Sequence, residues 1–161
     1  MKYPVRIITA EEDFCEIWIS EKTIAIPSTS NTKKIRRSKH GGIYLGNSDR
    51  AQRAFDALLG FLMHERKRLN ISFEKQRVSA FVVLCNRPTK NKAPTRFDSH
   101  NYSKPIGDLL ERAGFFSDDT NAEIFCIKAS DYDLPNEGIT KIRIYARKNV
   151  KNRVLEFFEC A

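Results

Sequence analysis

The 161-residue sequence has no apolar run near the ~20 residues that a helix needs to cross a bilayer. Its first ten residues also lack a basic stretch followed by an apolar one, so we expect no signal peptide. These two absences predict an intracellular, cytoplasmic protein that has no membrane partner.

Several chemical signatures are missing as well. The four cysteines form no C-x-x-C pair and lie far apart, which argues against a structural zinc site or a disulfide framework. The sequence has no G-x-S-x-G, no G-x-x-x-x-G-K-[ST] and no H-E-x-x-H motif. These gaps exclude the common serine-hydrolase, phosphate-loop and zinc-protease patterns.

Acidic residues are the scarcer of the two charged classes. The chain has 28 Lys and Arg against 20 Asp and Glu, which gives a net charge of +8 and a pI of about 9.4. Such a balance favours a polyanionic partner, because Lys and Arg release counterions when they meet phosphates. The composition, 41% hydrophobic and 30% charged, is otherwise that of one globular domain spanning residues 1–161.

Hydrophobic periodicity and turn residues predict an α+β fold, a mixed β-sheet with two main helices packed against it. The helices are expected from Asn47 or Ser48 to about Leu69 and from near Ser99 to Gly114. The expected strands are Phe14–Ile19, Thr23–Ile26, Arg77–Leu84, Ala122–Lys128 and Thr140–Ala146. Ser28–Gly46 is expected to be a polar loop, and the tail Val150–Ala161 is apolar enough to dock on the domain.

Two loops concentrate positive charge. The predicted DNA-contacting residues are Lys33, Lys34, Arg36, Arg37 and Lys39 in the first loop and Lys90, Lys92 and Arg96 in the second. The second loop delivers its charge directly before Asp98. We interpret both as phosphate-contacting segments that form one basic surface, with ordinary solvated loops as the alternative.

The most informative stretch is DSHNYSKPIGDLLERAGFFSDD, residues 98–119. It places Asp98, His100 and Lys104 at the start of an amphipathic helix and Asp118-Asp119 after its end. We expect the helix and its turn to carry the two acidic groups toward each other. Carboxylates gathered on a basic protein predict a divalent cation, Mg²⁺ or Mn²⁺, acting on a phosphodiester backbone. The alternative is that they are ordinary loop acids flanking a helix.

His100 has three possible roles: a metal ligand, a general base, or a hydrogen-bonding residue at the helix start. Imidazole suits Mn²⁺ better than Mg²⁺, which prefers oxygen ligands.

The same stretch resembles the RusA family of Holliday-junction resolvases, whose core reads roughly D-x-D-N-x-x-K, an amphipathic helix, A-G-F/V and an acidic pair. The matching residues are Asp98, Asn101, Lys104, Asp108, Ala113-Gly114-Phe115 and Asp118-Asp119. Ile26-Pro27 with Ser30-Asn31 is a weaker match to the family's early L-P-x-x-x-S/N segment.

The resemblance implies a RusA-like α+β fold, working as a homodimer on a four-way DNA junction. It implies that Asp98 and Asp119 are metal-binding catalytic acids, Lys104 is the catalytic lysine and Asp118 is an auxiliary acid. His100 stands where the family has its second aspartate, so it becomes a catalytic and metal-binding candidate by position. The implied function is metal-dependent endonucleolytic resolution of Holliday junctions in recombination and repair.

Two alternatives stay open. One is a non-catalytic nucleic-acid-binding module of the same fold, and the other is a nuclease of other branched or linear nucleic acid. Backbone contacts that ignore base identity look alike in a sequence, so the pattern does not choose among them.

Overall fold

The computed structural model describes residues 4–29, 33–73, 76–85, 97–132 and 137–147. For Lys33, Arg36, Tyr44, Leu45 and Asp119 it describes the backbone alone. The elements are β1 (Val5–Ala10), β2 (Phe14–Ser20), β3 (Lys33–Arg37), β4 (Ile43–Asn47), α1 (Asp49–Leu69), β5 (Val78–Leu84), α2 (His100–Arg112), η1 (Asp119–Asn121), β6 (Ala122–Lys128), η2 (Ala129–Tyr132) and β7 (Ile139–Ala146).

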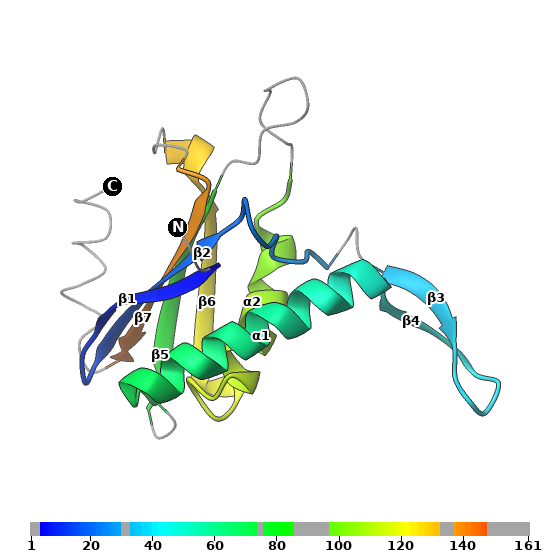
Figure 1. Cartoon of the computed structure of the whole chain (residues 1–161), viewed down its shortest axis with the longest axis horizontal. Helices are drawn as coiled ribbons and strands as arrows, with labels where there is room; N and C mark the ends of the chain where they lie inside the picture. Colours follow the sequence, from blue (N-terminus) through cyan, green and yellow to red (C-terminus); the bar gives the residue numbers. More distant parts are fainter. Residues whose placement is uncertain (1–3, 30–32, 74–75, 86–96, 133–136, 148–161) are drawn as a thin grey trace.

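Five strands form one mixed sheet in the order β1-β2-β7-β5-β6 (Figure 1). All neighbours in it are antiparallel except β5 and β6, which run parallel. A parallel pair needs a crossover connection, and α2 supplies it between β5 and β6. The described part of the chain therefore confirms the expected α+β class and mixed sheet.

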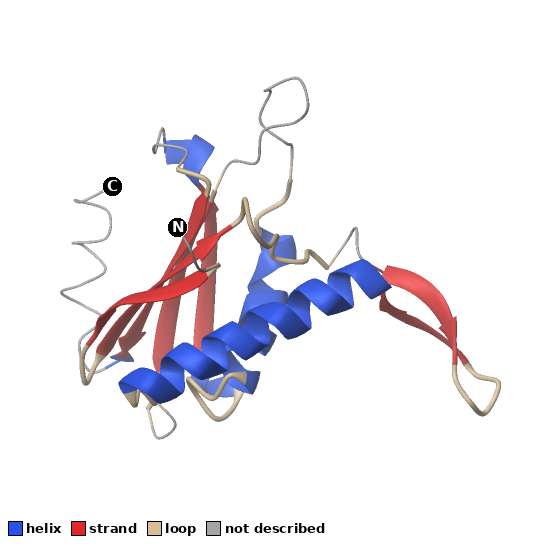
Figure 2. Cartoon of the chain, in the orientation of Figure 1, coloured by secondary structure: helices blue, strands red, loops and turns tan. Residues whose placement is uncertain are grey.

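One face of this sheet carries the main core, and both helices contribute to it (Figure 2). Alternate residues of the central strands, such as Val82 and Ile142, are fully buried there against Leu58 and Leu62 of α1 and Leu110 of α2. On the opposite face a smaller cluster forms around Phe81 and Tyr145. The apolar residues at every second strand position and the apolar stripe of each helix thus pack together in one layer.

Helix α1 begins and ends where its sequence signals predict. The Ser48 hydroxyl accepts the Ala51 amide at 3.3 Å, and Asn70 adopts a left-handed conformation with φ 52° after the last turn. Arg66, Lys67 and Arg68 lie in that last turn, where positive charge opposes the negative end of the helix dipole.

Three predictions for the first third of the chain are corrected. Thr23–Ile26 is not a strand, because the amides of Thr23 and Ile24 both donate to the Ser20 carbonyl in a turn. Val5–Ala10, for which no strand was predicted, forms the edge strand β1. The expected loop Ser28–Gly46 contains the hairpin β3–β4 instead, and this forms a separate two-stranded sheet.

The other expected strands and the second helix are found within one or two residues of their predicted bounds. The tail Val150–Ala161 lies outside the described residues. In the part of the chain that the structure describes, no helix is long and apolar enough to span a membrane.

Candidate functional site

The start of α2 is organised by Asp98. Its Oδ1 accepts the backbone amide of His100 at 3.0 Å, and its carbonyl accepts the amide of Asn101 at 3.2 Å. Ser99, which occupies the N-cap position, makes no side-chain capping bond. Asp98 therefore takes the capping role, and its negative charge lies at the positive end of the helix dipole. The side chains of both Asp98 and His100 are exposed.

A second contact joins this helix start to a segment early in the chain. The backbone amide of Thr29 donates to the Asn101 carbonyl at 3.0 Å, and the Thr29 hydroxyl lies 3.3 Å from both Asn101 oxygens, the carbonyl and Oδ1. The Asn101 carbonyl accepts these bonds because the residue four positions later is Pro105, which has no amide hydrogen to offer.

Lys104 lies one turn further along α2. Its Nζ is 3.3 Å from Oδ1 of Asp108, and the two side chains are 70% and 39% exposed. The pair has the i, i+4 spacing of a surface ion pair, so its contribution to stability is small. The ammonium group thus lies on the solvent side of the helix, one turn after His100.

Aromatic packing fixes the helix start against the sheet. The rings of Phe97 and Tyr102 meet edge to face with centroids 5.5 Å apart. The Nζ of Lys128 lies 5.9 Å from the Phe97 ring centroid and 3.5 Å from a carboxylate oxygen of Asp131. Because Lys128 is the last residue of β6, these contacts place Asp98 near the end of that strand.

The acidic pair after α2 stands at the other end of the helix. Gly114 ends the helix with φ +81°, and the Phe115 carbonyl accepts the Phe73 amide at 2.7 Å. Asp118 then caps the turn η1, since its Oδ1 accepts the Thr120 amide at 2.8 Å and its carbonyl accepts the Asn121 amide at 3.1 Å. Strand β6 begins at the next residue.

Two lengths give the separation between the acidic groups. Helix α2 has 13 residues, which at 1.5 Å per residue span about 20 Å. Strand β6 has seven residues, and its extended backbone also spans about 20 Å. Asp98 lies at the end of β6 and Asp118 before its beginning. Within one chain, the turn after α2 therefore leaves Asp118 and the Asp119 backbone far from Asp98. The sequence had predicted that this turn would bring the two acidic groups together.

The donors at the α2 start fit a divalent cation only in part. Asp98 offers a carboxylate and His100 an imidazole, and no group of three or more His, Cys, Asp or Glu side chains suited to a metal is found among the described residues. Mg²⁺ is commonly held by one or two carboxylates, with waters and substrate phosphate oxygens completing the shell. A metal at this site therefore needs ligands beyond these two side chains.

The cations of the first predicted basic segment lie on the hairpin β3–β4. The hairpin projects beyond the N-terminal end of α1 (Figure 1). Lys34 pairs with Asp49 at 2.8 Å, while Arg37 and Lys39 are exposed. The side chains of Lys33 and Arg36 are not described, and Lys90, Lys92 and Arg96 lie outside the described residues. A single basic surface that combines both segments stays a prediction.

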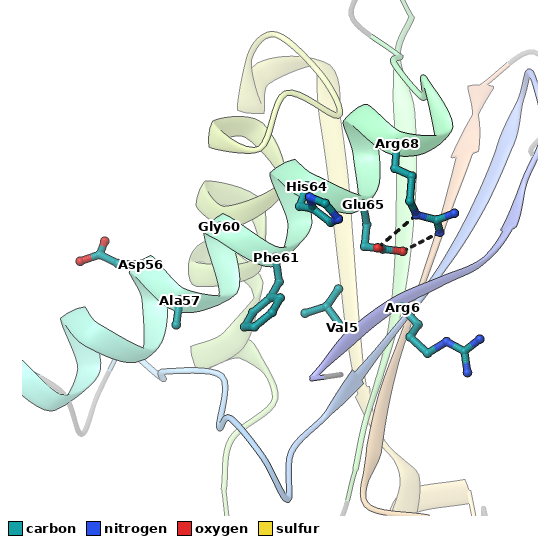
Figure 3. A pocket seen from close by; sticks show the side chains of 9 residues that line it. All are labelled: Val5, Arg6, Asp56, Ala57, Gly60, Phe61, His64, Glu65 and Arg68. Carbon is teal, nitrogen blue, oxygen red and sulfur yellow. Dashed lines mark hydrogen bonds and ion pairs between the residues drawn. The ribbon is translucent and has the colours of Figure 1, made fainter. Parts of the chain in front are cut away.

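A separate pocket of about 880 Å³ lies between α1 and the edge strand β1 (Figure 3). Val5, Phe61 and Glu65 are among the residues that line it, and Glu65 pairs with Arg68 at 2.8 Å. The Arg68 hydrogen bond lowers the pKa of Glu65, and a bond to the Ile7 backbone acts in the same direction. None of the predicted site residues lines this pocket.

Two described cysteines are poor nucleophiles. Burial raises the pKa of Cys15 to about 12 and that of Cys126 to about 11. Both thiols are therefore disfavoured as thiolates near neutral pH.

No protein-family model matches this chain, and comparison with curated proteins finds no similar sequence. The resemblance over residues 98–119 therefore stays a prediction. The described geometry adds one residue that the predicted site lacked, Thr29. The weak upstream match that begins at Ile26-Pro27 was the only signal in the sequence for its proximity to α2.

Proposed function

We propose that this protein is a divalent-metal-dependent endonuclease that hydrolyses phosphodiester bonds in branched DNA, in the manner of the RusA-like resolvases that residues 98–119 resemble. The observation that carries the proposal is that Asp98 caps the start of α2, with His100 as the first residue of the helix and Lys104 one turn further on. Carboxylates are repelled by phosphates, so an exposed acid on a protein of net charge +8 is most useful if it holds a cation.

Each of the three residues has a distinct role in this proposal. Asp98 supplies a hard oxygen ligand, and its Oδ1 is held by the His100 amide. His100 supplies a nitrogen ligand from the position where the family pattern has an aspartate. Lys104 stabilises negative charge that develops on the phosphoryl group or on the leaving oxygen. A bound Mg²⁺ or Mn²⁺ supplies Lewis acidity and a more acidic water.

The remaining ligands come from a second chain. Because about 20 Å of helix separates Asp98 from Asp118 in one chain, we propose that Asp118 and Asp119 of one copy complete the centre that begins at Asp98 of the other. A two-fold dimer then holds two equivalent centres, which suits paired cuts on the two opposing strands of a junction.

A second candidate function is favoured by the same separation. A protein that only binds nucleic acid has no need to gather Asp98 and Asp118 around one cation, and the basic hairpin β3–β4 accounts for its affinity. In that case Asp98 and Asp118 act only as caps of α2 and η1, a role that their hydrogen bonds already fulfil.

Cleavage of a synthetic four-way junction separates the two candidates. The native protein and Asp98→Asn are incubated with the junction and with linear duplex of the same sequence, in Mg²⁺, Mn²⁺ or EDTA. If the protein is a nuclease, the native protein should cut the junction in a cation-dependent way and Asp98→Asn should not. The variant should still bind the junction. Tight binding by both proteins without cutting in either cation would support the binding module.

A further inference from the structure

The hairpin β3–β4 stands apart from the main sheet. Its five residue pairs run from Lys33 opposite Asn47 to Arg37 opposite Ile43, and in the described part of the chain it forms a sheet of its own. A two-stranded hairpin is marginally stable alone in water. An arm of this kind gains order from what it binds.

One face of this hairpin, which we call the ribbon (Lys33–Asn47), is apolar and exposed. Ile35 is paired with residue 45 and Ile43 with residue 37, so the two isoleucines lie on the same face and are diagonal neighbours. Ile35 is 71% exposed and Ile43 is 68% exposed, the two highest values among the large hydrophobic residues described. Arg37 shares their face, because it stands opposite Ile43. The ribbon thus presents two exposed isoleucines beside a cation.

The charge around this face identifies the partner. Residues 33–48 contain five Lys and Arg and no Asp or Glu, and Lys34 pairs with Asp49 at 2.8 Å just beyond them. A segment with this charge repels basic surfaces and attracts polyanions, and a two-stranded ribbon has the width to enter a nucleic-acid groove. Phosphates can pair with the cations, but they offer no apolar surface to the isoleucines. The faces of the bases offer such a surface.

We propose that the ribbon inserts at the branch point of the nucleic acid, with Ile35 and Ile43 against unstacked bases and the surrounding cations on the phosphates. This inference rests on the proposed function, whose substrate is branched DNA. Apolar wedges are inserted where base steps open, and at a branch point the stacking is already interrupted. The ribbon then supplies preference for branched over linear DNA, while the cations supply affinity for both.

The test compares two double variants that differ only in polarity. Ile35→Thr with Ile43→Thr and Ile35→Val with Ile43→Val have nearly the same shape and the same β-branched preference for strands. Equilibrium binding is measured on a four-way junction and on linear duplex over a range of salt, in EDTA so that nothing is cut. Ile8→Thr, a change at a 44% exposed isoleucine of β1, is the control away from the ribbon.

The Thr pair is expected to bind the junction about tenfold more weakly than the Val pair, since a hydroxyl buried without a hydrogen-bond partner weakens binding by roughly severalfold, relative to a methyl, at each of the two positions. Its salt dependence should equal that of the native protein, because no phosphate contact is lost. Ile8→Thr should bind like the native protein.

Three results overturn the inference. Equal junction affinity of the Thr and Val pairs shows that the isoleucines do not touch bases, and the proposed function then stands without the wedge. A native dimer that becomes monomeric only in the Thr pair, seen by sedimentation, shows that the face binds a second copy of the chain. If the native protein binds neither the junction nor the linear duplex, the proposed function itself is wrong.

Discussion

The backbone carbonyl of Asn101 accepts a hydrogen bond from the backbone amide of Thr29, 72 residues earlier in the chain, at 3.0 Å. Pro105 makes this contact available, because it cannot donate to that carbonyl from within α2. A proline that weakens the helix locally thereby fixes the start of α2 to the segment that leads into the ribbon. The helix start that carries Asp98 and His100 is positioned by this contact.

Thr29→Val tests the contribution of the hydroxyl. The variant keeps the backbone bond but loses the hydroxyl contacts to Asn101, so the free energy of unfolding should fall by about 1 kcal/mol. Thr29→Ser retains the hydroxyl and serves as the matched control. Urea unfolding measures the stability of both variants.

In a Pro105→Ala background the Asn101 carbonyl regains a partner within the helix, so Thr29→Val should lower the stability by less there. An equal cost in both backgrounds would show that Pro105 and the Thr29 contact are independent.

The sequence predicted most of the sheet and both helices because their signals are local. Ser48 caps α1, and the alternation of Ile142, Ile144 and Ala146 defines the buried face of β7. Ala122–Lys128 is found as a strand with the predicted bounds. In each case a residue pattern within ten positions decides the structure, so no knowledge of distant contacts is needed.

The ribbon was missed for a physical reason. Lys33–Arg37 has four cations in five residues, a composition that favours solvated loops over strands, and its pairing with Ile43–Asn47 is a contact between segments. The separation of Asp98 from Asp118 was missed because it depends on the direction in which α2 crosses between two parallel strands. A one-dimensional motif places these residues close in sequence and says nothing of that direction.

The cations of the ribbon should set the salt dependence of DNA binding. Replacing Arg37 and Lys39 by Gln should remove two phosphate contacts, so the slope of log K against log salt should become less negative by about 1.8, at about 0.9 for each contact. Lys67→Gln with Arg77→Gln changes the net charge equally at two exposed positions outside the ribbon. If both double variants flatten the slope equally, net charge and not the ribbon determines the affinity.

His100 should set the metal preference. A histidine ligand favours Mn²⁺ over Mg²⁺, and His100→Asp restores the hard oxygen that the family pattern has at this position. The cleavage rate in Mg²⁺ divided by the rate in Mn²⁺ should therefore rise at least severalfold in His100→Asp. His100→Asn, which keeps a neutral polar side chain, is the control. An unchanged ratio in His100→Asp would show that His100 is not a ligand and acts only at the helix start.

Glu65 should make stability depend on pH. The pKa of Glu65 is lowered from 4.5 in the folded protein, chiefly by its hydrogen bond with Arg68. The ionised form is therefore favoured by folding, and its contribution is present above pH 4.5 and lost as the pH falls through the lowered pKa. Glu65→Gln should reduce stability at pH 7, and the difference from the native protein should shrink below pH 4.5. Urea unfolding of both proteins at pH 7 and pH 3 measures this difference in stability. A difference that grows toward pH 3 would show that ionised Glu65 does not stabilise the fold.

In the proposed dimer, each catalytic centre takes Asp98 from one chain and Asp118 and Asp119 from the other. Two inactive proteins test it: Asp98→Asn, and the double variant Asp118→Asn with Asp119→Asn. In a mixed dimer of the two, one centre receives every native acid and the other receives none. Random exchange makes half of the dimers mixed, so about one quarter of the native number of centres should be intact.

The measurement is nicking of a four-way junction by each variant alone and by their equimolar mixture after subunit exchange. We expect no cutting by either variant alone and single-strand nicks by the mixture, at about one quarter of the native rate. A mixture as inactive as its components, under conditions where the native protein cuts, would show that the acids of one centre do not come from two chains.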